Sequence, residues 1–210
     1  MTTPGRFITF EGGEGAGKST QVRLLAERLA ACGIDPVLTR EPGGAPQAEI
    51  IRELLVTGEV DRWSAQAEAL LNYAARDDHL RSVIRPALAA GKWVLCDRFS
   101  DSTRAYQGLT GGVGPAMIDA VHREVVGDTE PDLTLIMDLS PQTGLARAEA
   151  RGDANRFENK GLAFHRRLRK AFQEIADRYP QRCVLLDASS GIEEIADEIF
   201  KRVEARLLSL

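Results

Sequence analysis

Five short, mainly apolar runs recur along the chain, separated by longer segments in which apolar residues return at helical spacing. The runs are "RFITF" at 6–10, "PVLTR" at 36–40, "KWVLCD" at 92–97, "LTLIMDL" at 133–139 and "RCVLLDA" at 182–188. They lack the strict alternation of half-exposed strands, which is typical of strands covered on both faces of a parallel sheet. The pattern therefore predicts five buried strands.

Helical periodicity fills the intervals between these runs. The longest pattern extends from about 64 to 89, with Leu80, Ile84 and Leu88 on one side. Further helices are predicted near 22–33, 46–56, 115–126, 141–150, 162–178 and 192–208. This alternation predicts an α/β fold, a doubly wound parallel sheet with helices on both faces and right-handed crossovers. Because such sheets bind ligands at the carboxyl ends of their strands, candidate chemistry should follow each strand.

Composition limits the class of protein. The 210 residues are 28% charged and 43% hydrophobic, which favours a folded globular chain over a disordered or membrane protein. No apolar run approaches the roughly 20 residues needed to cross a bilayer, and residues 1–13 lack the features of a signal peptide. We therefore expect one cytoplasmic domain over 1–210, in which the polar segment 151–161 forms a mobile loop.

Charge and cysteine content exclude two further classes. The net charge is −4 with mixed signs, which does not favour a nucleic-acid-binding surface. Cys32, Cys96 and Cys183 are odd in number and widely spaced, so the sequence predicts neither a zinc site nor a disulfide framework, and we expect buried, reduced thiols.

The segment "FEGGEGAGKST" at 10–20 joins the first predicted strand to the first predicted helix. Its spacing Gly12-x4-Gly17-Lys18-Ser19 matches a phosphate-binding loop, in which small residues let backbone N–H groups converge on a polyphosphate at a helix N-terminus. Lys18 would contact the β and γ phosphates, and the Ser19 hydroxyl would ligate Mg²⁺. A glycine-rich turn alone needs neither the lysine nor the hydroxyl. We predict an ATP or GTP site.

The third strand is followed by "DRFSDSTRAYQG" at 97–108. Asp97 ends an apolar run, as a Walker B carboxylate does, and could hold Mg²⁺, while Arg98 suits bidentate binding of a phosphate. An ordinary salt bridge at the strand end is the structural alternative. Asp138 also ends an apolar run, but Asp97 is favoured because polar residues follow it. These are Arg98, Ser102, Thr103, Tyr106 and Gln107.

Two weaker signals allow a structural or a functional interpretation. After the second strand, Arg40 and Glu41 precede a Pro-Gly-Gly turn in "REPGG", and the turn itself requires neither charge. Asn72 and Arg76 are four apart on the long helix, and such a stripe is a solvated face by default.

Arginines cluster near the polar segment 151–161. Arg147 approaches it, and Arg151 and Arg156 lie within it, where loop closure could bring cations onto a transferring phosphoryl group. Surface arginines on helices are common, so this pattern alone is a weak indication. No general base is evident, and none is needed if the acceptor is a phosphate with a second pKa near ~6.

Together these motifs resemble the bacterial thymidylate kinase family over nearly the whole chain. The matching stretches are "FEGGEGAGKST", "TREPGG", "AEALLNYAARDDHL", "DRFSDSTRAYQG", "PDLTLIMDLSP" and "RAEARGDANRFE". The resemblance implies a P-loop NTPase type of fold, with a five-stranded parallel sheet flanked by helices and a short lid at about 151–161. It also implies a homodimer and the reaction of Mg-ATP with dTMP to give ADP and dTDP.

The same resemblance implies roles for individual residues. The ATP phosphates and Mg²⁺ are held by Gly12, Gly13, Glu14, Gly15, Ala16, Gly17, Lys18, Ser19 and Thr20. Glu14 lies near the sugar 3′-hydroxyl and the metal, and Arg98 binds the dTMP phosphate in a pocket lined by Arg40 and Glu41. Arg76, Thr103 and Gln107 face the thymine, and Tyr106 favours deoxyribose. Because this loop lacks an arginine, Arg151 and Arg156 of the lid supply that catalytic charge, with Arg147 behind them.

One position departs from the family pattern. Asn72 stands where the family commonly has a phenylalanine that stacks on thymine. Tyr73 points about 100° away around the helix, so it cannot simply replace that ring. Loss of the stack could remove ~1 kcal/mol or more of base affinity.

Three alternatives follow from these observations. A related nucleotide kinase with another monophosphate substrate is kept open by Asn72. A GTPase would need N-K-x-D, but Leu162 follows Asn159 and Lys160 where the aspartate should be. A non-catalytic nucleotide-binding module is disfavoured by the intact Lys18 and Arg98.

Overall fold

The strands form one parallel sheet. The structure is a computed structural model that describes residues 5–150, 152 and 156–208. The sheet order is β2-β3-β1-β4-β5, with bounds β1 Phe7–Gly12, β2 Val37–Arg40, β3 Val94–Asp97, β4 Leu133–Asp138 and β5 Cys183–Asp187. Phe10 of β1 pairs with Asp97 of β3 on one side and Leu135 of β4 on the other. The predicted five-stranded parallel sheet is confirmed.

Helices connect the strands. They are α1 Lys18–Ala31, α2 Pro46–Val56, α3 Ala65–His79, η1 Leu80–Ile84, α4 Arg85–Ala89, α5 Ser100–Thr103, η2 Arg104–Thr110, α6 Pro115–Val125, α7 Pro141–Glu149, η3 Glu158–Lys160, α8 Gly161–Arg178, α9 Ile192–Val203 and η4 Glu204–Leu208. The predicted helix over 64–89 is the continuous run of α3, η1 and α4, and the Ser64 hydroxyl caps its start by accepting from Ala67 N at 3.1 Å. The sequence did not predict the helical segment 100–110.

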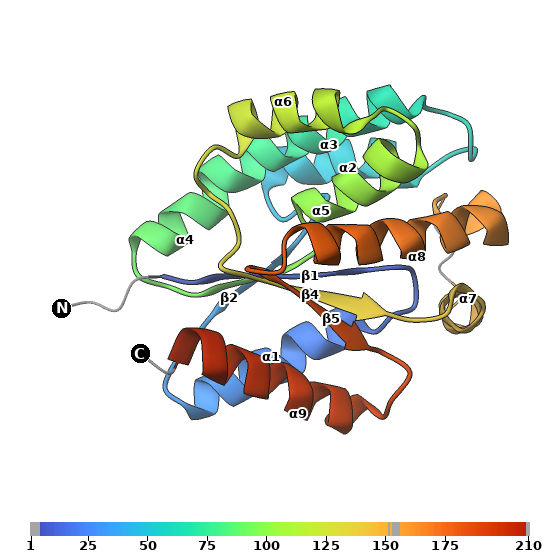
Figure 1. Cartoon of the computed structure of the whole chain (residues 1–210). Helices are drawn as coiled ribbons and strands as arrows, with labels where there is room; N and C mark the ends of the chain where they lie inside the picture. Colours follow the sequence, from blue (N-terminus) through green and yellow to red (C-terminus); the bar gives the residue numbers. More distant parts are fainter. Residues whose placement is uncertain (1–4, 151, 153–155, 209–210) are drawn as a thin grey trace.

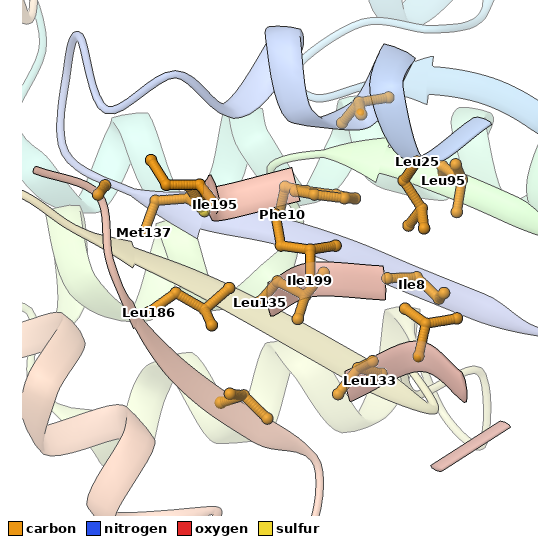
Figure 2. Packing of buried hydrophobic residues seen from close by; sticks show 14 of the residues in the cluster. Ile8, Phe10, Leu25, Leu95, Leu133, Leu135, Met137, Leu186, Ile195 and Ile199 are labelled. Carbon is orange, nitrogen blue, oxygen red and sulfur yellow. The ribbon is translucent and has the colours of Figure 1, made fainter. Parts of the chain in front are cut away.

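The helices cover the sheet in two layers (Figure 1). On one face, α1 and α9 pack over an apolar core that includes Phe10, Leu135 and Ile199, and Figure 2 shows these side chains meeting between sheet and helices. On the other face lie α3, α6 and α8 (Figure 1). Within the described ranges, no helix combines the length and apolar character needed to span a membrane.

Two expectations about burial were wrong in part. The strands β2 and β5 are the edges of the sheet, and they leave Leu38 and Leu185 exposed instead of covered on both faces. Edge strands have a neighbour on one side only, so fewer helices cover them. Cys96 and Cys183 are buried and free as expected, but Cys32, which follows α1, is exposed.

Candidate active site

A cavity of about 370 Å³ lies where several strands end. Its walls come from the loop after β1, the turn after β2, helices α2 and α3, the end of β3 with α5 and η2, and the segment before α8. The lining residues are Glu14, Gly15, Ala16, Gly17, Lys18, Ser19, Thr20, Arg40, Glu41, Pro42, Arg52, Val56, Asn72, Asp97, Arg98, Ser102, Thr103, Tyr106, Gln107, Phe157 and Glu158. The structure thus brings together most of the residues that the sequence analysis selected.

The loop after β1 has the backbone of an anion site. Gly15 and Gly17 have φ of +65° and +88°, a region that side chains strongly disfavour. A Cβ at Gly15 would also collide with the backbone oxygen of Gly144. Gly17 precedes α1 without a capping side chain, so N–H groups at the start of this helix can bind an anion. Gly12 and Gly13 form the base of the loop and do not line the cavity.

Lys18 lies along this loop and is almost fully buried. Its Nζ donates to Gly13 O at 2.8 Å and to Gly12 O at 3.3 Å. Burial, assisted by the nearby Arg98 cation, lowers the pKa of Lys18 to about 8, although neighbouring carboxylates oppose the shift. A polyphosphate in the cavity would supply the negative charge that this buried ammonium lacks.

Ser19 and Asp97 meet at the mouth of the cavity. The Ser19 hydroxyl donates to Asp97 Oδ2. Asp138, the alternative Walker B residue, instead accepts from Arg169 Nε at 2.7 Å and from its second guanidinium nitrogen at 2.8 Å. The geometry favours Asp97, because a hydroxyl and a carboxylate side by side are oxygen donors that suit Mg²⁺.

Arg98 is one of the charged residues that line the cavity. It has φ of +68°, the only positive φ among the described non-glycine residues, and such strain is frequent at functional positions. The guanidinium donates to Gly12 O at 2.9 Å, pairs with Glu14 at 3.1 Å and lies over the Tyr106 ring at 5.2 Å. Burial would lower the pKa of Arg98, but the combined effect of Tyr106, Glu14, Asp97 and Glu11 raises that pKa above its ordinary value, so the cation persists.

Glu14 is the counter-charge of this arginine. Burial raises the pKa of Glu14. The Arg98 and Lys18 cations and a 2.7 Å hydrogen bond from the Tyr106 hydroxyl lower it by more, so the pKa of Glu14 falls to about 2. Glu14 is therefore a carboxylate at neutral pH. It holds Arg98 and Tyr106 in fixed positions beside the phosphate loop.

Arg76 lies behind the cavity wall and does not line it. Its Nε pairs with Glu41 Oε2 at 2.7 Å, and another nitrogen donates to Thr103 Oγ1 at 3.1 Å. His79 Nδ1 lies 3.0 Å from the other Glu41 oxygen. Arg76 thus orients two lining residues, while Arg40 is largely exposed and pairs with Glu49 at 3.1 Å.

Of the arginines predicted near the lid, Arg156 and Arg147 do not line the cavity. Arg151 lies outside the described residues. Arg156 is fully buried: its guanidinium pairs with Glu68 at 2.7 Å and donates to the backbone oxygens of Leu55 and Val60 at 3.0 and 2.9 Å. Arg147 is exposed and donates weakly to Ala188 O at 3.5 Å. The expectation that Arg156 faces the phosphoryl group does not match this placement, because these contacts fix it against α2 and α3.

Sequence reasoning missed several residues of the site. Pro42, Arg52, Val56, Phe157 and Glu158 line the cavity without having been selected. Arg52, which donates to Pro42 O at 2.7 Å, occupies a polar position of an amphipathic helix, where it resembles a solvated residue. Glu11 was also missed, although a charged residue inside the apolar strand, in "FEGG", could have indicated it.

Glu11 is a buried carboxyl beside the cavity. It accepts from Phe99 N at 2.8 Å and from the Ser102 hydroxyl at 2.6 Å. Burial and the nearby Asp101 carboxylate raise the pKa of Glu11 to about 7. Glu11 therefore fixes the backbone that follows Arg98, and its role is to position the site.

Comparison with known proteins agrees with this geometry. The family model described as "Thymidylate kinase" matches residues 10–199. The chain is 60% identical to the thymidylate kinase of Caulobacter vibrioides over 98% of this chain and 99% of that protein, and 56% identical to one from Rhodopseudomonas palustris over 98% and 91%. A crystal structure of thymidylate kinase from Ehrlichia chaffeensis superposes with a TM-score of 0.79 at 35% identity, covering 95% of this chain and all of that one. The chain belongs to the thymidylate kinase family.

Proposed function

We propose that this protein transfers the γ-phosphoryl group of Mg-ATP to dTMP, giving ADP and dTDP for dTTP synthesis. The observation that carries the proposal is the cavity itself, which joins the glycine loop and Lys18 to Arg98 and to a polar end formed by Thr103 and Gln107. The phosphates of the donor fit the glycine loop with Lys18, the phosphate of the acceptor fits Arg98, and the base fits the polar end. Family membership supports the same reaction.

The donor side of the reaction belongs to the loop and its metal residues. The backbone from Glu14 to Thr20 and the Lys18 ammonium would hold the ATP phosphates, while Gly12 and Gly13 at the base of the loop position Lys18 through their carbonyl oxygens. Ser19 and Asp97 would hold Mg²⁺, which when bound neutralises charge on the phosphates. These groups act by position and charge, which is the main requirement of phosphoryl transfer.

The acceptor side belongs to Arg98. Its guanidinium would bind the dTMP phosphate and orient one oxygen toward the γ-phosphorus. A phosphate with a second pKa of about 6 is already ionised at neutral pH, so no protein base is required. Glu14 keeps Arg98 in place, and Arg52 adds a second cation to this part of the wall.

The remaining functional assignments are part of the same proposal. Residues 1–210 act as one catalytic unit, and the segment 151–161 closes as a lid that could bring Arg151 to the transferring group. Thr103 and Gln107 read the base, while Tyr106 crowds the position of a ribose 2′-hydroxyl. The enzyme works in the cytoplasm on free nucleotides and requires neither nucleic acid nor membrane.

A homodimer is also proposed. The neighbouring helices α2 and α3 leave large apolar side chains exposed, namely Ile50, Leu54 and Leu70. Exposed apolar residues on adjacent helices are suited to a helix-to-helix interface. Light scattering should give twice the 23.0 kDa chain mass, and Leu70→Glu should shift it toward the monomer.

The test is release of ADP with Mg-ATP and, in parallel, dTMP, dUMP, dCMP, dGMP and dAMP. Selective turnover of dTMP supports the proposal. Faster turnover of another monophosphate would move the substrate assignment, since Asn72 replaces the usual aromatic residue. No release of ADP with any of the five monophosphates, despite ATP binding, would favour a non-catalytic nucleotide-binding module.

A further inference from the structure

Glu68 connects the base end of the cavity to the segment before α8. It lies on α3, is 1% exposed, and does not line the cavity. One carboxylate oxygen, Oε1, faces Arg156 at 2.7 Å and Lys160 at 3.3 Å. The other, Oε2, accepts from Gln107 Nε2 at 2.8 Å. Arg156 and Lys160 thus fix the Glu68 carboxylate through Oε1, and its Oε2 fixes the side chain of Gln107.

This arrangement fixes the orientation of the Gln107 amide. An ionised carboxylate can only accept hydrogen bonds, so the amide must turn its NH₂ toward Glu68. The opposite atom, Oε1, is then left for the cavity that Gln107 lines. Within the described part of the chain, no protein donor contacts this oxygen. Gln107 therefore presents a hydrogen-bond acceptor, its Oε1, to a ligand in the cavity.

We propose that Glu68 is a positioning residue that makes the pocket select pyrimidines carrying an N3–H donor. Thymine and uracil carry this hydrogen, whereas N3 of cytosine is an acceptor and would face the Gln107 oxygen without a hydrogen bond. A site built to pair one polar group rejects an analogue that leaves that group unpaired. The inference rests on the proposed function and extends it to the origin of base selectivity.

Glu68→Gln tests this directly. A glutamine can accept or donate, so the Gln107 amide becomes free to reverse and present its NH₂ to cytosine. We expect the ratio of kcat/KM for dTMP to that for dCMP to fall about tenfold or more. The dTMP to dUMP ratio should stay within about twofold, because both bases carry N3–H. General damage to the fold would lower all three values together.

Lys160→Met is the matched control. It removes a partner of the same carboxylate but leaves the Oε2 bond to Gln107, so both ratios should remain at their wild-type values. If Glu68→Gln fails to fold, Glu68→Gln combined with Arg156→Met removes both members of the buried pair, a replacement that proteins commonly tolerate. A folded variant of either kind that keeps the full preference for dTMP over dCMP overturns the inference.

Failure of the proposed function would be visible separately. If the wild-type protein does not phosphorylate dTMP, the ratio of calorimetric Kd values for dTMP and dCMP takes the place of the kinetic ratio. A preference for dTMP that collapses in Glu68→Gln supports the positioning role even then. An unchanged binding preference contradicts it.

Discussion

The core beneath α1 and α9 and the wall of the cavity are held together by different forces. The first is built from aliphatic and aromatic side chains such as Leu25, Leu135 and Ile199 (Figure 2). The second is supported from behind by buried ion pairs, such as Glu41 with Arg76 and Glu68 with Arg156. Apolar burial stabilises a fold wherever it occurs, whereas a buried ion pair gives little net stability but fixes geometry.

The comparison predicts that changes to the two regions affect different properties. A substitution in the apolar core should lower stability and leave the chemistry of surviving molecules intact. A substitution at the cavity should alter catalysis or selectivity more than stability. The following experiments test this division, beginning with the largest expected effect.

Lys18→Met should lower kcat/KM by about 10³-fold or more, because it removes a cation from the site of developing phosphate charge. Its effect on folding should be small or even favourable, since burial already disfavours the charged lysine and lowers its pKa to about 8. Steady-state kinetics and thermal unfolding measure both effects. Lys170→Met, at an exposed position of α8, is the control. Retention of wild-type turnover in Lys18→Met would remove the lysine from the mechanism.

Leu135→Ala should produce the opposite result. Leu135 is fully buried in β4, an interior strand between β1 and β5, and such truncations cost about 2–5 kcal/mol of unfolding free energy. The kcat of the folded fraction should change little. Leu185→Ala on the edge strand β5 makes the same truncation at an exposed site, and should cost clearly less by urea denaturation. Equal losses of unfolding free energy at Leu135 and Leu185 would mean that burial does not determine how much each truncation destabilises the fold.

Acidification should weaken the cavity wall through Glu14. Its folded-state pKa of about 2 lies below the ordinary value of 4.5, so its contribution is present above pH 4.5 and is lost as pH falls from 4.5 toward 2. The shift corresponds to about 3 kcal/mol. The difference in unfolding free energy between wild type and Glu14→Gln should therefore narrow across this window. Denaturant titrations at pH 6, 4 and 3 measure it, and a constant difference would contradict the pairing with Arg98.

The apolar region was readily predictable from the sequence. All five strands and most helices follow from local hydrophobic patterns, because each element buries one face or stripe. The segment 100–110 was missed for a physical reason. Its polar residues, including Thr103 and Gln107, are buried against the cavity and other polar partners, so no apolar period reveals the helix.

The cavity was predictable only where a local motif carries the chemistry. The glycine loop and the Asp97-Arg98 pair can be found in short stretches of sequence. Glu68 could not, because it is one charged residue in a helix and its partner Lys160 lies 92 positions away. Arg156 was expected to be catalytic, but its placement depends on backbone oxygens of Leu55 and Val60 that no pattern indicates.

Asn72→Phe tests the smallest effect, which concerns the base alone. Asn72 lines the cavity and donates to the Glu68 backbone oxygen at 2.8 Å, while Tyr73 is buried in the core and supplies no ring to the site. A phenylalanine here can stack on thymine, and we expect dTMP to bind about fivefold more tightly, or ~1 kcal/mol. Asn72→Leu adds apolar surface without a ring and is the matched control. Calorimetric titration with dTMP distinguishes the two variants. An equal gain in dTMP affinity for both would assign the effect to apolar burial. A gain in affinity with phenylalanine alone would show that the cavity has room for an aromatic ring against the base and that the wild-type protein does not supply one.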